Sequence, residues 1–191
     1  MRSPPSCWAI STRTAWKPIY QKIGDREQLC RKIEIIPLEV VFHNRISGSL
    51  ASRLGVDDGF KPANTILDLC YNNDELGDPL INRDQAAALG LATYLELDVM
   101  YDIVRRSGKL LTDLFEKAGI ELVDAKFEFG RASDTGSIII SDEISPDTCR
   151  LWDMETGERL DKDRFRLDLG DVTASYGIVL EKLKNVFDIE D

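Results

Sequence analysis

Histidine is nearly absent from this chain, since His43 is the only one in 191 residues. The four cysteines, Cys7, Cys30, Cys70 and Cys149, form no C-x-x-C pair. These two shortages disfavour a zinc site, which proteins build mainly from cysteine and histidine. They also leave a Ser-His-Asp triad with a single candidate base. We expect the cysteines to be reduced, as they are in cytosolic proteins.

Positive charge is also in short supply. The chain has 24 Lys and Arg against 34 Asp and Glu, which gives a formal net charge of −10 at pH 7. Such a surface repels polyanions, so nucleic acid and anionic membranes are disfavoured as partners. No apolar run reaches the length of a membrane span, and the first residues lack the apolar core of a signal peptide. The sequence therefore predicts a cytoplasmic globular protein.

A strongly patterned strand is predicted over residues 122–130. Successive side chains of a strand point to opposite faces, so the pattern separates into an apolar set and a charged set. One face carries Val123, Ala125, Phe127 and Phe129, and the other carries Asp124, Lys126 and Glu128. The charged face is the first candidate for a functional site.

A hairpin is predicted after this strand, because Asp-Thr-Gly at 134–136 suits a three-residue loop with Gly in the left-handed position. If residues 133 and 137 close the loop, Glu128 lies directly across from Asp142. Facing carboxylates repel each other, and a divalent cation would remove that cost. Oxygen ligands suit magnesium. The alternative is that these carboxylates are simply solvated.

Periodicity and turn signals predict several shorter elements. Strands are expected over 34–42 and 64–71, and Pro37 marks an irregular or edge position in the first of them. A short helix is expected after Gly48, and a loop is expected around Trp152.

The longest helix is predicted to begin at a capping box formed by Thr93 and Glu96 and to end at Gly119. A final amphipathic helix is expected over 172–186. The apolar stripe of the long helix is interpreted as core, and it consists of Leu97, Met100, Val104, Leu111, Leu114, Phe115 and Ala118.

Five segments resemble one enzyme family in the same order along the chain. Residues 122–130 and 142–152 are similar to the two signature segments of phosphoribosylaminoimidazole-succinocarboxamide synthase, the SAICAR synthetase of purine biosynthesis. Residues 35–49 resemble that family's other signature, and 77–82 and 161–166 are also similar. Several long motifs in one order are far more specific than a lone glycine-rich loop.

The resemblance implies an α+β fold. It combines the remnant of an N-terminal β lobe with a larger mixed domain of antiparallel strands and helices. The expected division is a leader that is unrelated or disordered over 1–15, a remnant of the ATP-binding lobe over 16–44, and a substrate- and magnesium-binding domain over 45–191.

The resemblance also implies a reaction. ATP phosphorylates the carboxylate of 5-amino-1-(5-phospho-D-ribosyl)imidazole-4-carboxylate, the amine of L-aspartate attacks, and SAICAR forms with ADP and phosphate. Such chemistry needs magnesium and fixed cations to hold the substrates in line. The expected partners are these small molecules, and a homo-oligomer is possible.

The family pattern assigns roles to eleven positions of this sequence. The implied catalytic residues are Lys126 and Asp147. The implied substrate-binding residues are Ser49, Asp78, Arg150, Arg166 and His43. Glu39, Glu128 and Asp142 are expected to bind the nucleotide, and Glu128, Asp142 and Asp124 are expected to bind the metal.

Each of several roles has a structural alternative. Lys126 could form only an ion pair with the carboxylates beside it. Ser49 could be only a helix cap, and Asp78 could form only an Asx turn before Pro79. Arg166 could pair only with acidic neighbours at the surface.

Two positions depart from the family pattern, which has Arg in place of His43 and Lys in place of Asn72. Both differences remove a permanent positive charge expected near bound anions. Family members also begin with a complete ATP-binding lobe containing a Gly-Lys-Ala-Lys segment, which this sequence does not contain.

Three functions are therefore kept open. The first is the synthetase itself, an ATP-dependent carbon–nitrogen ligase. The second is a truncated, catalytically silent homologue that binds the ribonucleotide but does not bind ATP productively. The third is an unrelated magnesium-dependent phosphotransferase that shares only the acidic hairpin.

Overall fold

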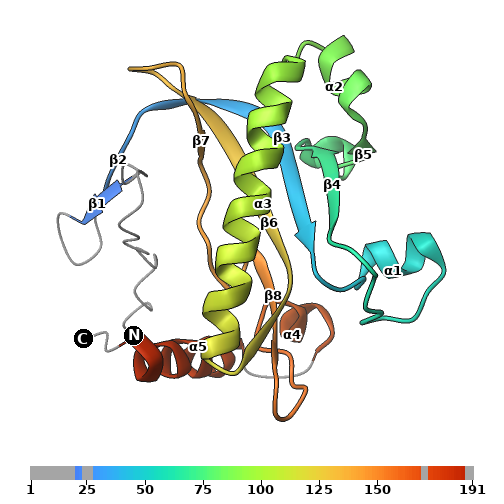
Figure 1. Cartoon of the computed structure of the whole chain (residues 1–191), viewed down its shortest axis with the longest axis vertical. Helices are drawn as coiled ribbons and strands as arrows, with labels where there is room; N and C mark the ends of the chain where they lie inside the picture. The colour runs from blue at the N-terminus through green and yellow to red at the C-terminus, as the bar shows by residue number, and fades with distance from the viewer. Residues whose placement is uncertain (1–19, 23–27, 169–171, 188–191) are drawn as a thin grey trace.

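The structure is a computed structural model that describes residues 20–22, 28–168 and 172–187. The chain combines helices with antiparallel strands in an α+β arrangement (Figure 1). The strands are β1 (Tyr20–Lys22), β2 (Gln28–Cys30), β3 (Ile33–His43), β4 (Ile66–Tyr71), β5 (Leu80–Ile81), β6 (Ile120–Ala132), β7 (Ile138–Ile140) and β8 (Cys149–Asp153). The helices are α1 (Ser49–Leu54), the short 3₁₀ helix η1 (Asp74–Leu76), α2 (Arg83–Ala88), α3 (Tyr94–Lys117), α4 (Asp163–Arg166) and α5 (Val172–Phe187).

Six strands form one antiparallel sheet in the order β5-β4-β3-β6-β7, with β8 also paired to β6. The expectation that Pro37 marks an irregular position is confirmed, because the register between β3 and β6 shifts between Ile36 and Glu39. The expectation of an edge strand is wrong, since β3 is central and pairs with both β4 and β6. Proline has no N–H to donate to a neighbouring strand, and the bulge interrupts the hydrogen-bonded ladder at this position. The strand can therefore lie inside the sheet.

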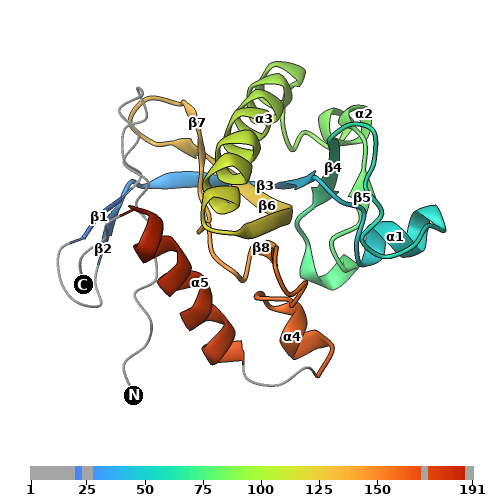
Figure 2. The same cartoon turned by 60° about the horizontal axis from the view of Figure 1, so that its bottom comes forward.

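Helix α3 covers one face of the sheet (Figure 2). The predicted capping box is confirmed, because Thr93 and Glu96 each accept a hydrogen bond from the other's backbone. Apolar side chains on this helix, including Leu97, Met100 and Leu111, are buried in the main core. The predicted final helix is confirmed as α5, which adds Val179 and Leu183 to the same core.

The apolar face of β6 differs from the prediction at one position. Ala125, Phe127 and Phe129 lie in the main core as expected, but the fourth member is Leu122, and Val123 lies outside the cluster. A register shift between residues 122 and 124 interrupts the alternation, and the Val123 carbonyl accepts hydrogen bonds from the backbone of Asn44 and Arg45. A bulge therefore reverses the face on which the first residues of the strand point.

The hairpin between β6 and β7 is present, but its register is one residue from the prediction. Arg131 pairs with Ile138, and the backbone N–H of Ser141 donates to the carbonyl of Glu128 at 2.9 Å. Glu128 therefore faces Ser141, and Asp142 follows just beyond the strand. A four-residue loop from 133 to 136, closed by the Ala132 N–H on Ser137, accounts for the difference.

The segment around Trp152, expected to be a loop, is strand β8, and it pairs with β6. Helix α2 was not predicted, and it begins at a capping box formed by Asn82 and Gln85. No helix among the described residues is long and apolar enough to cross a membrane. The expected leader over 1–15 lies outside the described residues, and the division at residue 44 stays a prediction.

Candidate functional site

The sheet face opposite α3 is lined with charged side chains. On β6 these are Asp124, Lys126 and Glu128, which alternate with the buried apolar residues. Strand β3 pairs Glu39 with Glu128 and His43 with Asp124. The predicted charged face of 122–130 is therefore confirmed, and the central strand adds two further groups to it.

Three carboxylates converge on the ammonium of Lys126. Its Nζ contacts Glu128 at very short range and lies 3.4 Å from Glu39 Oε2 and 3.7 Å from Asp142 Oδ2. Burial lowers the pKa of Lys126, but the three carboxylates raise it by more, so the ammonium stays charged. Burial raises the pKa of the Glu39 carboxyl despite Lys126. We call Glu39, Glu128, Asp142 and Lys126 the Lys126 cluster.

A second group of charges surrounds Arg150 on β8. Its Nη1 lies 2.5 Å from Asp124 Oδ2, and its Nε lies 2.7 Å from Asp163 Oδ2. Both carboxylates are nearly buried, with 7% and 6% of their side chains exposed. Burial lowers the pKa of Arg150, but the two carboxylates raise it by more. We call these three residues the Arg150 cluster.

Asp163 is a centre for three arginines, a role that the sequence did not reveal. Besides Arg150, it accepts from Arg166 Nη1 at 2.8 Å and from Arg159 Nη1 at 3.3 Å. Burial raises the pKa of Asp163, but the guanidinium groups of Arg166 and Arg150 lower it by more. Arg166 therefore joins the Arg150 cluster through a buried carboxylate and not through an isolated surface pair. The three-residue spacing within α4 was the available signal.

His43 lies between two carboxylates. Its Nδ1 is 3.5 Å from Asp124 Oδ2, and its Nε2 is 3.6 Å from Asp68 Oδ2. These distances are slightly long for hydrogen bonds, and neither nitrogen has another partner among the residues that the structure describes. Burial lowers the pKa of His43, but Asp124 and Asp68 together raise it by more. The imidazole is thus favoured as a cation, which partly replaces the charge that arginine would carry.

His43 is expected to titrate above its ordinary value of about 6.5. Because its folded-state pKa is raised, its stabilising contribution is complete below about pH 6.5 and is lost as the pH rises through the folded-state value. NMR titration of the single imidazole measures this pKa directly. Asp68→Asn should lower it, whereas Asp102→Asn, at an exposed pair on α3, should leave it unchanged. A value at or below 6.5 in the unmodified chain would contradict the geometry.

The turn that carries Ser49 lies next to Arg150, although 101 positions separate Ser49 from Arg150 in the sequence. Gly48, the residue before Ser49, has φ of 59°, and a β-carbon added there would lie 2.7 Å from Arg150 Nη2. The Ser49 side chain is exposed at the start of α1. The N-cap position of this helix is Gly48, so no side chain caps the helix. The structure therefore brings together the predicted anion-binding turn and the predicted anion-binding arginine.

Gly48→Ala is expected to destabilise the protein by about 1–3 kcal/mol more than Gly55→Ala. Both glycines have positive φ, but Gly55 has no atom within 4 Å of the added methyl group. At Gly48 the methyl group meets a guanidinium that Asp124 and Asp163 hold in place. Urea denaturation of the two variants compares them directly. Equal losses would show that Arg150 moves aside without cost.

Two other predicted residues make local contacts. Asp78 has φ of 50°, and its Oδ1 accepts the N–H of Asn73 at 2.9 Å, so its side chain closes the loop behind it and does not make the Asx turn expected before Pro79. Asp147 accepts the hydroxyl of Tyr176 at 2.8 Å and lies 3.9 Å from Lys162 Nζ. These contacts place Asp147 beside α5, at the edge of the charged face. Asn72 donates its backbone N–H to the carbonyl of Pro37.

The metal set Glu128, Asp142 and Asp124 needs a correction. Four residues of a strand span roughly 13 Å, so Asp124 and Glu128 lie far apart along β6. Asp124 also points to Arg150, whereas the other two carboxylates point to Lys126. No group of three His, Cys, Asp or Glu side chains within the described ranges is arranged to hold a metal by itself.

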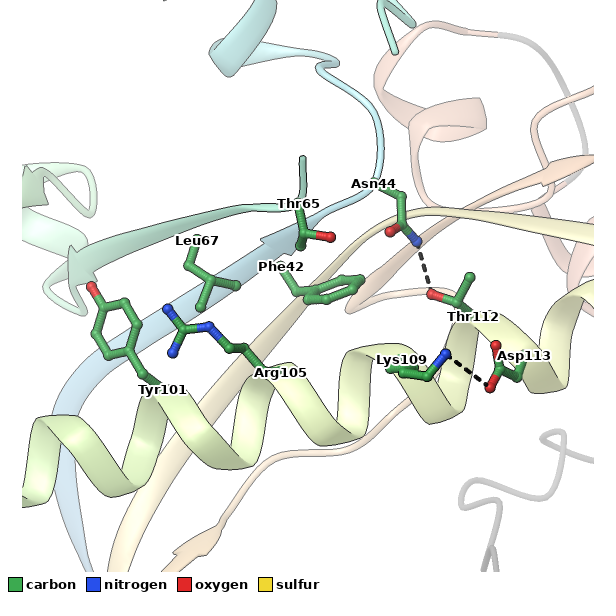
Figure 3. A pocket seen from close by; sticks show the side chains of 9 residues that line it. All are labelled: Phe42, Asn44, Thr65, Leu67, Tyr101, Arg105, Lys109, Thr112 and Asp113. Carbon is green, nitrogen blue, oxygen red and sulfur yellow. Dashed lines mark hydrogen bonds and ion pairs between the residues drawn. The ribbon is translucent and has the colours of Figure 1, made fainter. Parts of the chain in front are cut away.

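A hollow of about 580 Å³ lies on the other face of the sheet (Figure 3). It runs between α3 and β4, and Leu67 and Phe42 form part of its lining together with Tyr101 and Arg105 of the helix. Phe42 belongs to the apolar face of β3, whereas His43 points to the charged face. The hollow is therefore separate from the two charged clusters.

Comparisons with known proteins point to a single family. The family model described as SAICAR synthetase matches residues 8–183. A phosphoribosylaminoimidazole-succinocarboxamide synthase from Fusobacterium nucleatum is 54% identical over 163 residues, which are 85% of this chain and 68% of that protein. The enzyme of the same name from Clostridium novyi is 53% identical over 165 residues, or 86% and 69% of the two chains.

Solved structures agree with the sequence relatives. The phosphoribosylaminoimidazole-succinocarboxamide synthase from Ehrlichia chaffeensis superposes with a TM-score of 0.85 at 39% identity, covering 93% of this chain and 75% of that one. A SAICAR synthetase solved in complex with ADP gives a TM-score of 0.83 at 40% identity, covering 88% and 72% of the two chains.

Proposed function

Because this chain belongs to the SAICAR synthetase family, we propose that it ligates L-aspartate to the carboxylate of 5-amino-1-(5-phospho-D-ribosyl)imidazole-4-carboxylate with hydrolysis of ATP. The products are SAICAR, ADP and phosphate, and the reaction belongs to purine biosynthesis. The observation that carries the proposal is the charged sheet face, on which the Lys126 cluster and the Arg150 cluster lie side by side along β6.

The two clusters suit different substrates. The Lys126 cluster combines three carboxylates with one ammonium, and its net negative charge suits a divalent cation. The Arg150 cluster places a guanidinium beside the turn at Gly48, and guanidinium groups bind phosphate in a bidentate manner. We therefore assign the metal–nucleotide phosphates to the first cluster and the ribonucleotide phosphate to the second.

Magnesium fits the Lys126 cluster by its donor chemistry. The oxygens of Glu39, Glu128 and Asp142 already converge on a cation, the Lys126 ammonium, and magnesium prefers such oxygen ligands. Glu128 and Asp142 are the proposed metal ligands, and Glu39 is a proposed nucleotide-binding residue. When bound, magnesium would neutralise phosphate oxygens during phosphoryl transfer.

Lys126 has a proposed catalytic role in addition to its ion pairs. Glu128 and Asp142 would hold magnesium, and the Nζ of Lys126, which lies among the same carboxylates, would hold the acyl phosphate or the attacking amine in line. Positioning of this kind supplies much of the rate enhancement in phosphoryl and acyl transfer. Asp147, at the edge of the face and hydrogen-bonded to Tyr176, is proposed to hold the L-aspartate amine.

The ribonucleotide is proposed to lie between the turn and the arginines. Ser49 and Arg150 would bind its phosphate, and His43 as a cation would add charge on the same side. Arg166, anchored by Asp163, would reach the substrate from the α4 side. Burial raises the pKa of Glu39, and the nearby charge of Asp78 raises it further, so Asp78 lies close to the Lys126 cluster. Asp78 is proposed to contact the amine of the imidazole substrate, beside the substrate carboxylate that is phosphorylated.

Four broader proposals accompany this function. The chain is proposed to be cytoplasmic, to act on small molecules, and to form a homo-oligomer. It is also proposed to divide at residue 44, with the segment before that residue forming part of a nucleotide-binding lobe. Size-exclusion chromatography with light scattering would measure the oligomeric state.

A coupled ADP-release assay tests the proposed function. The reaction would contain ATP, magnesium, the carboxylated ribonucleotide and L-aspartate, and each substrate would be left out in turn. We expect ADP release that depends on L-aspartate and on the ribonucleotide. Release without L-aspartate would favour a different phosphotransferase, and ribonucleotide binding without release would favour the catalytically silent homologue.

A further inference from the structure

The turn that carries Ser49 is held by a carboxylate farther along the same loop. Asp58 Oδ1 accepts the hydroxyl of Ser47 at 2.8 Å and the backbone N–H of Gly48 at 2.9 Å. These two hydrogen bonds fix the residues on which the orientation of Ser49 depends. Burial raises the pKa of Asp58, but the hydrogen bonds lower it by more, so the carboxylate stays charged.

The other oxygen of Asp58 connects the turn to the Arg150 cluster. Asp58 Oδ2 lies 2.7 Å from Arg159 Nη2, and Arg159 Nη1 lies 3.3 Å from Asp163 Oδ2. The same oxygen of Asp163 accepts the Nε–H of Arg150 at 2.7 Å. A continuous chain of ion pairs therefore joins the backbone of Gly48 to the guanidinium that faces it.

Contacts with the Trp152 ring hold the arginines next to this series of ion pairs in place. The Arg159 guanidinium lies 5.5 Å from the ring centre of Trp152, and Arg45 lies 5.9 Å from the same ring. A β-carbon added to Gly59 would be 2.9 Å from that ring, so the loop sits directly on it. Trp152 belongs to β8, the strand that carries Arg150, and α1 and α4 lie toward the same end of the molecule (Figures 1 and 2).

We propose that Asp58, held by Arg159, is a positioning residue that fixes the Gly48–Ser49 turn relative to Arg150 and thereby sets the affinity for the ribonucleotide phosphate. The inference rests on the proposed function, because it assumes that this phosphate binds between Ser49 and Arg150. Neither Asp58 nor Arg159 is placed in contact with the phosphate.

Contacts that do not involve Asp58 also hold the loop. Residues 46 and 60 close it through a β-bridge, and Ile46, Leu50 and Ala51 form a small apolar cluster inside it. The Asp58 side chain itself is 44% exposed. Its removal is therefore expected to leave the loop folded and to free the orientation of the turn. This separates positioning from a general structural role.

Isothermal titration calorimetry with the carboxylated ribonucleotide and, separately, with Mg²⁺–ADP tests the inference. Asp58→Ala is expected to raise the Kd for the ribonucleotide about tenfold, the size of effect expected for lost hydrogen bonds to a charged group. Asp58→Asn keeps an acceptor for Ser47 and Gly48, so it should restore part of the affinity. The Kd for Mg²⁺–ADP should stay unchanged in both variants.

The matched control is Asp57→Ala, which removes the same charge from the neighbouring exposed position. Its Kd for the ribonucleotide should equal that of the unmodified chain. Arg159→Ala should act like Asp58→Ala, and the double variant should bind about as well as either single one, because both changes break the same connection.

The outcomes distinguish this inference from the proposed function. If Arg150→Ala weakens ribonucleotide binding but Asp58→Ala behaves like Asp57→Ala, the positioning role is wrong and the phosphate site stands. If the unmodified chain does not bind the ribonucleotide, or Arg150→Ala has no effect, the phosphate site itself is wrong. Equal losses for the ribonucleotide and Mg²⁺–ADP, with a lower melting temperature, would show a structural role and overturn the inference.

Discussion

Arg150→Ala is expected to lower the free energy of unfolding by about 3–5 kcal/mol and to abolish measurable ribonucleotide binding. The variant leaves Asp124 and Asp163 without the guanidinium that both contact, and each carboxylate is at least nine-tenths buried. Asp163 keeps Arg166 and Arg159 as partners, but among the described residues Asp124 keeps only His43 at 3.5 Å. A buried charge that loses its main partner is far more costly than the loss of a surface ion pair. Urea denaturation at pH 7 and calorimetry with the ribonucleotide measure the two effects.

Arg106→Ala is the matched control for stability. Arg106 forms an ion pair with Asp102 on α3, but 59% of its side chain is exposed. Exposed pairs of this kind contribute about 0–1 kcal/mol. If the two arginine variants lost similar stability, the Arg150 cluster would be solvated and its carboxylates would not depend on the guanidinium.

Glu128→Ala is expected to abolish magnesium-dependent binding of ADP. The carboxylate contacts Lys126 and, by the proposed function, supplies one of two metal ligands. Loss of a ligand also leaves Asp142 alone to hold the ion, and a single carboxylate binds magnesium weakly. Calorimetric titration of ADP in the presence of magnesium, and then of a chelator, would measure the metal-dependent part of the affinity.

Glu121→Ala provides the control on the same strand. Glu121 lies on β6 but pairs with Arg45, away from the Lys126 cluster. Its removal should leave magnesium-dependent ADP binding unchanged. Unaltered binding in Glu128→Ala would instead show that the carboxylates around Lys126 are a structural ion-pair group and that the metal binds elsewhere.

The sequence by itself determined the elements whose signals are local. The capping box of Thr93 and Glu96 marked the start of α3, since both hydrogen bonds join residues three apart. The alternation around Lys126 predicted the charged face of β6, because period-two geometry depends only on the strand itself. The long collinear motifs also predicted the family that the comparisons confirm.

Pairing between strands was beyond the reach of those local signals. The bulge at Val123 depends on hydrogen bonds from Asn44 and Arg45, which lie on a distant segment. The register of the hairpin depends on whether its loop has three or four residues. The four-residue loop places Ser141, and not Asp142, opposite Glu128. Pro37 indicated either an irregular or an edge position, and only the pairing of β3 with its neighbours showed that a bulge lies beside it at the centre of the sheet.

The Arg150 cluster was decided only by the tertiary structure. The sequence motifs indicated Ser49 and Arg150 as separate candidates for anion binding. Gly48 lies close to the Arg150 guanidinium only because the loop around α1 packs on β8. The sequence did not reveal the roles of Asp163 and Asp58, although Asp163 lies three residues before Arg166, because a carboxylate gains its role from the arginines that the fold brings to it. Local sequence sets which face a side chain occupies, whereas burial and long-range pairing set which charges must meet there.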